Sequence, residues 1–469
     1  MNWDALLIGL APEHFLLAGL VLTIVISIAQ GDQGRGQAVL SLVCVAGATV
    51  SAAVLGLQGY SGTPFEGQLS VSPAASLGKA VALALALPVL LMAREDHAGG
   101  GPFYPLLLSS LYGLALMLGA DSFLTLFLGL ELMSMPVYVM VLLGHAERRR
   151  ATPSAEAALK YIVLGGAATA TLLMGVSLLY GQGGTLALSI FTRALAGSDA
   201  MATTGAVLVL LAFFLKGAVV PFHTWAPDAY EGASVSVTAY MAAIVKAGVL
   251  LAALRLFGEA ALSRPMINLL ALLPLASVVW GNLAAMRQPN LRRMMAYSGV
   301  AHAGYLYLAF LGAGPGRFQA VLFYLLAYGL MTLLALAALP SHTDDDTQRD
   351  RLDHLRGLFH RHPYAALVIG LAMLSLAGIP PLPGFVAKFL IFREVMAAGY
   401  TTVAVLGLIG SYLGIYFYLR VIQLMFMSAL PAPVQGAAPA RSAAIVASAL
   451  CLAGAVIVAV APGWVMGGM

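Results

Sequence analysis

The chain has 469 residues, of which 61% are hydrophobic and 9% are charged, with 24 Lys and Arg against 20 Asp and Glu. Soluble domains carry about 25% charged residues, so this composition excludes a soluble globular enzyme, a disordered chain and a nucleic-acid-binding protein. At about 20 apolar residues per crossing, it predicts an all-α integral membrane protein embedded in a lipid bilayer.

Apolar runs separated by polar breaks give about fourteen candidate transmembrane helices. They are residues 15–29, 38–57, 75–92, 105–118, 123–143, 157–179, 206–220, 235–254, 266–286, 294–311, 320–339, 364–392, 403–427 and 443–460. The one long polar connection, residues 341–363, is too short to form a domain. We therefore expect a single polytopic membrane domain over residues 1–469.

Arginines fall unevenly on alternate loops of this topology, with fourteen on one side and five on the other. Because cytoplasmic loops are enriched in Lys and Arg, the larger group marks the cytoplasmic side. Both termini are then expected outside the cytoplasm, which agrees with an even number of spans.

The lysines are distributed differently from the arginines. Every arginine lies in a loop or near the end of a run, whereas the lysines lie inside apolar runs; they are Lys79, Lys160, Lys216, Lys246 and Lys388. Arginine keeps its proton in proteins, whereas the pKa of lysine responds to burial and to neighbours. Among the acids, only Glu131 lies near the middle of a run. This pattern indicates proton chemistry inside the membrane.

An ionisable residue at the centre of a span costs about 2.5–3.5 kcal/mol on insertion scales. Four such residues, Glu131, Lys216, Lys246 and Lys388, are therefore candidates for proton translocation. A Glu–Lys pair whose separation changes would act as a proton switch, because an opposite charge favours the ammonium form. The alternative is that each lysine is a static ion-pair partner or extends to the interface.

Prolines interrupt two of the runs, after Lys216 at residues 221–227 and before Lys388 at residues 380–383. Proline removes a helix donor, and non-helical backbone at membrane depth is tolerated only inside protein or along a water-filled cavity. The breaks therefore predict a polar interior, although proline loops at the membrane surface are the alternative. His223 and His302 lie near these features and fit either a proton relay or packing.

Cys44 and Cys451 lie far apart in separate apolar runs, which indicates neither a disulfide nor a metal cluster. The sequence also lacks a phosphate-binding glycine loop, an iron–sulfur pattern and a haem motif. We therefore expect no cofactor, metal or redox centre in this chain.

Three segments together resemble a known family. They are PFHTWAPDAYEG at 221–232, RRMMAYS at 292–298 and LAGIPPLPGF at 376–385. The chain resembles the antiporter-like membrane subunits of respiratory complex I, the proton-pumping NADH-quinone oxidoreductase, and among them the subunit N family.

The resemblance implies fourteen transmembrane helices with two inverted five-helix repeats, at 105–256 and 266–427, each containing a broken helix. It also implies roles for the charged residues. Glu131 and Lys216 would form a modulating pair, Lys246 would be the central relay residue, and Lys388 would lead toward the exit. Lys160 would be a further relay member.

The resemblance further implies a proton-translocating subunit coupled to quinone reduction in other subunits of a bacterial complex. The chain would lie in the cell inner (cytoplasmic) membrane with both termini periplasmic, bound to other membrane subunits, including antiporter-like ones, in a hetero-oligomer. NAD, FMN, iron–sulfur clusters and quinone would be held by partner subunits. The alternatives are a cation/proton antiporter subunit, for which further central carboxylates are expected, and a non-transporting scaffold of the membrane arm.

Overall fold

The fold was analysed in a computed structural model of the chain. The structure describes residues 3–30, 34–97, 101–143, 151–197, 199–258, 261–312, 314–339, 351–428 and 442–463. Five of the arginines used to orient the chain, at positions 148–150, 349 and 441, lie outside the described residues.

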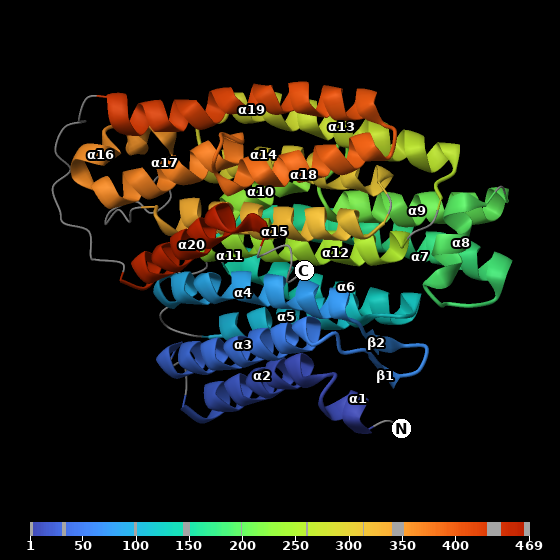
Figure 1. The fold of residues 1–469 in the computed structure, drawn as a ribbon. Helices are drawn as coiled ribbons and strands as arrows, with labels where there is room; N and C mark the ends of the chain where they lie inside the picture. Colours follow the sequence, from blue (N-terminus) through green and yellow to red (C-terminus); the bar gives the residue numbers. More distant parts are fainter. Residues whose placement is uncertain are drawn as a thin grey trace.

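The N-terminal part packs four long helices beside a short hairpin. Its elements are α1 (Trp3–Leu7), α2 (Ala11–Gln30), α3 (Gly34–Leu57), β1 (Gly62–Phe65), β2 (Leu69–Val71), α4 (Pro73–Asp96) and α5 (Phe103–Gly119). The two strands are antiparallel. In Figure 1, α2 and α3 form one edge of the molecule, and the hairpin lies at one end of these helices.

The next part leads to the first interruption. Its elements are α6 (Phe123–Leu143), α7 (Ala151–Gly183), α8 (Ser189–Ala196), α9 (Ala200–Lys216), α10 (Trp225–Gly232), α11 (Val235–Tyr240), a π-helical segment (Met241–Val245) and α12 (Lys246–Phe257). The last three elements follow one another without a gap and form one continuous helical segment.

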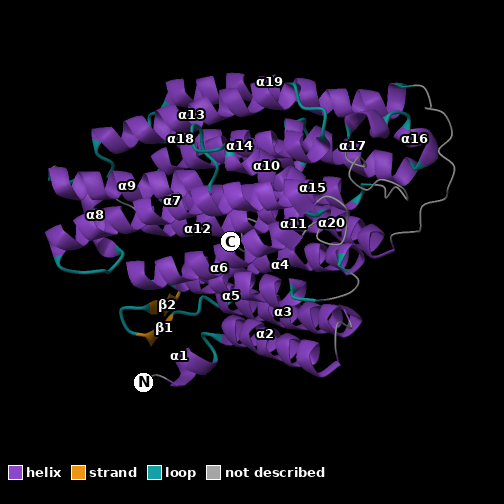
Figure 2. Ribbon diagram, turned by 180° about the vertical axis from the view of Figure 1, so that it is seen from behind, coloured by secondary structure: helices purple, strands orange, loops and turns teal. Residues whose placement is uncertain are grey.

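The remaining elements contain the second interruption. They are α13 (Arg264–Met286), α14 (Leu291–Leu308) with a 3₁₀ turn (Ala309–Leu311), α15 (Pro315–Ala337), a 3₁₀ turn (Leu352–Leu355), α16 (Leu358–Arg361), α17 (Pro363–Ala377), α18 (Pro383–Ala397), α19 (Thr401–Met427) and α20 (Ser442–Val460). Helices α13 and α19 form the edge opposite α2 and α3, and the view from behind agrees (Figure 2).

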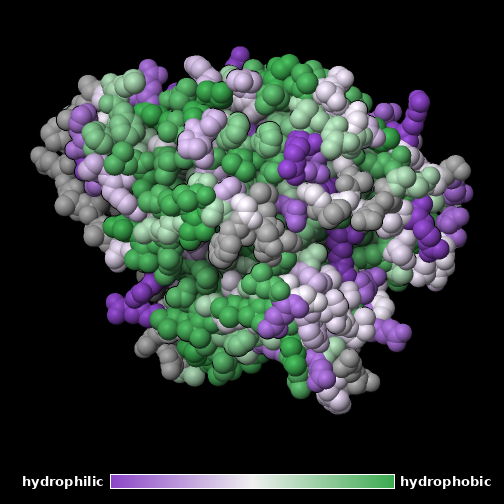
Figure 3. Space-filling model, viewed as in Figure 1, coloured by the Kyte–Doolittle hydropathy of each residue, from purple (hydrophilic) through white to green (hydrophobic). Residues whose placement is uncertain are grey.

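The long helices are suited to a membrane. Among the described residues, ten helices are long and apolar enough to cross one, or eleven if the bent pair α8 and α9 counts as one span. Large hydrophobic side chains such as Ile28, Leu272 and Tyr412 are exposed, and hydrophobic residues cover broad areas of the surface in Figure 3. Exposed apolar surface of this extent is expected where lipid or other membrane subunits cover the protein.

Two segments occupy the centre of the bundle. Val235–Phe257 and α15 are buried along nearly their whole length, whereas α2, α3 and α19 are mostly exposed. Carboxylates at the end of α4 bind two helix starts: Asp96 accepts the N–H of Ser236 at 2.9 Å, and Glu95 accepts those of Ala443 and Ala444 at 2.8 and 3.3 Å. A carboxylate at a helix N-terminus satisfies free N–H groups there. These contacts fix the starts of the central segment and of α20.

Both interruptions predicted from the prolines are present. Helix α9 ends at Lys216 and α10 begins only at Trp225, with Ala218 between them at a φ of 58°. The run predicted at 364–392 is divided into α17 and α18, because Gly378 ends α17 with a φ of 88° and the prolines that follow cannot continue the helix. Each break therefore lies within a few residues of a buried lysine.

Candidate functional site

The first charged pair joins α6 to α9. Nζ of Lys216 lies 3.3 Å from Oε1 of Glu131, and 6% and 15% of the two side chains are exposed. The same Nζ lies 3.3 Å from the Ser134 hydroxyl and 3.2 Å from the Tyr138 hydroxyl. On the other side, the Thr169 hydroxyl of α7 donates to Oε1 of Glu131 at 2.5 Å. Each charge therefore keeps neutral hydrogen-bond partners if the two separate.

Lys246 has a different environment. It opens α12 directly after the π-helical segment, a local irregularity common at functional sites. Its Nζ donates to the carbonyl oxygen of Gly299 at 2.6 Å and lies 5.4 Å from the centre of the Tyr328 ring. A Cβ at position 299 would lie 2.7 Å from Nζ, so the close approach requires glycine. Among the described residues, Lys246 forms no ion pair.

Lys388 lies on α18 beside the second break. Its Nζ donates to the carbonyl oxygens of Leu376 and Ala377 at 3.0 and 3.1 Å, and to the Ser411 hydroxyl at 2.9 Å. The two carbonyl groups belong to the C-terminal end of α17, which carries the negative end of the helix dipole. The interrupted helix thus supplies acceptors for a buried ammonium without a carboxylate.

His302 is buried and contacts four tyrosines. Its Nδ1 lies 2.7 Å from the Tyr324 hydroxyl and its Nε2 3.1 Å from the Tyr418 hydroxyl. Its ring also contacts Tyr328 and Tyr305, with ring centres 4.6 and 5.6 Å apart. Both ring nitrogens therefore have hydroxyl partners that can donate or accept a proton.

Two of these tyrosines connect the lysines. Tyr328 contacts both Lys246 and His302, and Tyr305 contacts both His302 and Lys388, whose Nζ lies 5.3 Å from the centre of the Tyr305 ring. The structure therefore places His302 between the two lysines. It brings these three sequence candidates into one continuous buried cluster.

The two charged regions are joined through α5 and α6. The Tyr240 hydroxyl donates to the Ser110 hydroxyl at 2.8 Å, and the latter donates to the Met133 carbonyl oxygen at 2.7 Å. Met133 precedes Ser134, which contacts Lys216, and Tyr240 lies six residues before Lys246 on the same continuous helical segment. Hydrogen bonds and backbone thus connect the Glu131 pair with the helix of Lys246.

His223 lies apart from Lys216, in the loop between α9 and α10. Its Nε2 accepts the indole N–H of Trp280 at 3.0 Å, and its ring faces Tyr297. Burial lowers the pKa of His223, partly opposed by the Pro221 backbone. His223 therefore connects the first break to α13 and α14.

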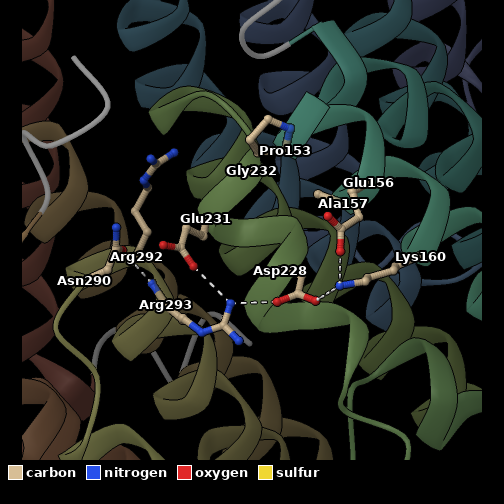
Figure 4. Close-up of a pocket in the computed structure, with 10 residues that line it drawn as sticks. All are labelled: Pro153, Glu156, Ala157, Lys160, Asp228, Glu231, Gly232, Asn290, Arg292 and Arg293. Carbon is tan, nitrogen blue, oxygen red and sulfur yellow. Dashed lines mark hydrogen bonds and ion pairs between the residues drawn. The ribbon is translucent and has the colours of Figure 1, made fainter. Parts of the chain in front are cut away.

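Lys160 lies in a charged pocket instead of the buried cluster. Its side chain is 45% exposed and pairs with Glu156 and Asp228, both at 2.7 Å. Asp228 and Glu231 in turn accept from Arg293 at 2.6 and 2.9 Å. Figure 4 shows this chain of five alternating charges along a cavity of about 310 Å³. The structure does not bring Lys160 into contact with the other lysines.

Replacing Asp228 with asparagine should destabilise the protein by about 0.5–1 kcal/mol, because two partly exposed ion pairs are lost. Burial would raise the pKa of Asp228, but hydrogen bonds and charges from Lys160 and Arg293 lower it below the ordinary value. The stabilisation should therefore be present at neutral pH and disappear as the pH falls through this lowered pKa.

Thermal unfolding of the two proteins between pH 7 and pH 3 tests this expectation. Glu156→Gln is the matched control, because Glu156 is 62% exposed and its pair lies on one helix. An Asp228→Asn difference that grows as the pH falls would contradict the assignment.

One buried pair was missed in the sequence. Oε1 of Glu13 on α2 lies 2.5 Å from Nζ of Lys79 on α4, with 4% and 2% of the side chains exposed. Glu13 precedes the first predicted run, so it was not counted among membrane-embedded acids. A signal for this pair was present in the sequence. Glu13 lies within one turn of the apolar run 15–29, and Lys79 lies inside the run 75–92 without an acid in the same run.

The chain was compared with known families and curated proteins. The family model for the transmembrane part of NADH:quinone oxidoreductase and Mrp antiporters matches residues 120–414. A Pelobacter propionicus protein named NADH-quinone oxidoreductase subunit N is 38% identical over 424 residues, which cover 90% of this chain and 89% of that protein. The protein of the same name from Laribacter hongkongensis is 34% identical, covering 91% and 89%.

Two solved structures are also similar to this chain. A chain of respiratory complex I from Thermus thermophilus with bound aureothin superposes with a TM-score of 0.82 at 34% identity, covering 97% of this chain and 98% of that one. A chain of the Mrp complex from Dietzia sp. DQ12-45-1b gives a TM-score of 0.84 at 22% identity, with 100% and 96% covered, and so is similar in fold.

Proposed function

The chain belongs to the NADH:quinone oxidoreductase/Mrp antiporter transmembrane family, and we propose that it is the subunit N-type, proton-translocating membrane subunit of a bacterial NADH-quinone oxidoreductase. The observation that supports the proton function is the buried series of charges. Glu131 pairs with Lys216, and Lys246 and Lys388 follow in the interior, joined through His302 and two tyrosines.

The two kinds of lysine environment suggest how a proton would move. Lys216 keeps its proton while Glu131 is near, since an opposite charge favours the ammonium form. If the carboxylate withdraws, Lys216 releases a proton toward Lys246, which is held only by a carbonyl oxygen and an aromatic ring. Moving one charge against 100 mV requires about 2.3 kcal/mol, which equals about two pKa units. The change in proton affinity that follows when one ion pair separates is therefore of the size needed to move a proton against this potential.

We also propose the finer membrane topology. Fourteen crossings, two inverted repeats at 105–256 and 266–427, and periplasmic termini are consistent with the arginine distribution and with one interrupted helix in each range. The host membrane would be the bacterial inner membrane. Limited proteolysis of right-side-out vesicles, read with antibodies against each terminus, tests this arrangement.

The chain's part in the enzyme would be proton transfer alone. NAD, FMN, iron–sulfur clusters and quinone would bind to partner subunits, and this chain would respond to quinone reduction through contacts with neighbouring membrane subunits. Its assembly with other antiporter-like subunits is supported by the complexes to which it is similar.

Purification from native membranes in mild detergent tests the assignment. We expect the chain to co-migrate with flavin and iron–sulfur subunits in a fraction with NADH:quinone activity. Co-migration only with other antiporter-like membrane subunits, without this activity, would contradict it and indicate a cation/proton antiporter.

A further inference from the structure

A second buried ion pair lies outside the series of charges described above. Glu13 on α2 and Lys79 on α4 are 2.5 Å apart and almost completely buried. Both residues precede residues 120–414, which the family model matches. The proton relay from Glu131 to Lys388 does not use this pair.

The carboxylate of Glu13 is only half satisfied. Oε1 accepts from Lys79, whereas Oε2 is buried and has no hydrogen-bond partner among the described residues. An ionised oxygen without a donor is unfavourable in a buried site, whereas the adjacent Lys79 ammonium favours the carboxylate form. Oε2 is therefore the atom at which a proton can bind while Lys79 stays on Oε1.

Polar groups lie near Lys79 at the hairpin end of the bundle. Nζ of Lys79 and the carbonyl oxygen of Ser70 both lie beside Gly119. An alanine Cβ at this position would be 3.4 Å from each of them. The Ser70 hydroxyl donates to Asp121 at 2.8 Å, and Arg255 donates to the same carboxylate oxygen at 2.5 Å. Asp121 is 35% exposed, and Arg255 lines a cavity of about 410 Å³.

Among the described residues, few other titratable groups lie around the pair. His14 follows Glu13 on α2, and its Nε2 lies 2.9 Å from the Leu6 carbonyl oxygen. Tyr112 of α5 lies within electrostatic reach of Glu13, and Arg317 of α15 lines the same cavity as Arg255. Helix α3 carries one charged residue, Arg35, near its opposite end. The other charged residues of α4 also lie in its last turn, away from Lys79. Lys79 is thus the charged group that pairs directly with Glu13.

Resting on the proposed function, we propose that Glu13 and Lys79 form a second proton-exchange pair, loaded from the cavity that Arg255 lines at the hairpin end. On loading, a proton from water forms an O–H bond with Oε2, and the carboxylate becomes a neutral carboxylic acid beside the Lys79 ammonium. On release, this O–H bond breaks, the proton returns to water, and the ion pair is restored. No electron is transferred.

Infrared difference spectroscopy of the assembled complex during turnover tests the proposal. We expect a carbonyl band of a protonated carboxylic acid that shifts in D₂O, disappears in Glu13→Gln and reappears at a shifted position in Glu13→Asp. Ser41→Ala is the matched control, because it removes another buried polar group, on α3, which packs against both α2 and α4, and should leave the band unchanged. The same band in wild type and Glu13→Gln would overturn the proposal.

The double variant Glu13→Gln/Lys79→Met separates proton exchange from a structural ion pair. It removes both charges together, so it should assemble even if either single variant does not. We expect it to lack the band and to transfer fewer protons per NADH in vesicles. Assembly with wild-type proton transfer would overturn the proposal.

A parallel Lys246→Met complex keeps the two hypotheses apart. Impaired proton transfer in Lys246→Met, with an unchanged carboxylic-acid band in Glu13→Gln, would overturn only the second exchange pair. Normal proton transfer in Lys246→Met would overturn the proposed function itself.

Discussion

Replacing Lys246 with methionine should lower proton-coupled NADH:quinone turnover of the assembled complex by about tenfold or more, since removing a proton-transfer group commonly costs about 10²–10⁴-fold in rate. Lys246 forms no ion pair among the described residues, so the variant leaves no unpaired carboxylate behind. Burying an ammonium is itself unfavourable. The folded protein should therefore be at least as stable as the wild type while its activity falls.

Turnover and proton uptake in reconstituted vesicles, together with thermal unfolding, measure both effects. Leu250→Met is the matched control, because it introduces the same side chain one turn further along α12 at a fully buried apolar position. It should leave turnover nearly unchanged. Wild-type proton stoichiometry in Lys246→Met would contradict a relay role and support a non-transporting scaffold.

Replacing Lys216 with arginine should impair turnover nearly as much as replacing it with methionine. Arginine keeps the positive charge beside Glu131 but cannot release its proton. If Lys216 exchanges a proton, a fixed charge blocks the step, and the loss should approach the lower part of the 10²–10⁴ range of proton-transfer groups. If Lys216 only balances Glu131, arginine should preserve the rate.

The readout is the rate of coupled turnover in Lys216→Arg relative to Lys216→Met and wild type. Thr169→Val is a control for disturbance of the pair, because it removes one hydrogen bond to Glu131 and keeps both charges. Its effect should be smaller than that of Lys216→Arg. Wild-type rates in Lys216→Arg would identify Lys216 as a static counter-ion.

The three central lysines differ in the acceptors that hold their ammonium groups, and this difference bears on the direction of proton transfer. Lys216 is held by a carboxylate, Lys246 by one carbonyl oxygen, and Lys388 by helix-end carbonyls and a hydroxyl. The acceptors of Lys388 belong to an interrupted helix and cannot withdraw without changing the break. We therefore expect proton transfer to be controlled by a change in the position of the Glu131 carboxylate, and not by the acceptors of Lys388.

The membrane character of the chain was predictable from sequence because hydropathy and run length depend on composition alone. The two interruptions were predictable as well, since each contains two or three prolines within seven residues. Single prolines, by contrast, lie inside the continuous helices α4, α6 and α13, at Pro88, Pro136 and Pro274. The concentration of lysine inside apolar runs selected Lys216, Lys246 and Lys388 before any contact was known. These are local properties of the chain.

Contacts between helices were not predictable in this way. An apolar run has the same composition whether it faces lipid or protein, so α2 and the central segment of Lys246 look alike in sequence although one is exposed and the other buried. The same ambiguity hid the partner of Lys79, because Glu13 lies near the start of α2 and meets α4 only after the two helices pack.

The sequence by itself therefore determined which lysines and which acid lie within apolar runs, and where two helices break. Only the tertiary structure decided which of them meet: His302 lies between Lys246 and Lys388, whereas Lys160 faces a charged surface pocket. The physical reason is that a buried charge depends on partners supplied by other helices. Those partners are set by packing and not by spacing along one run.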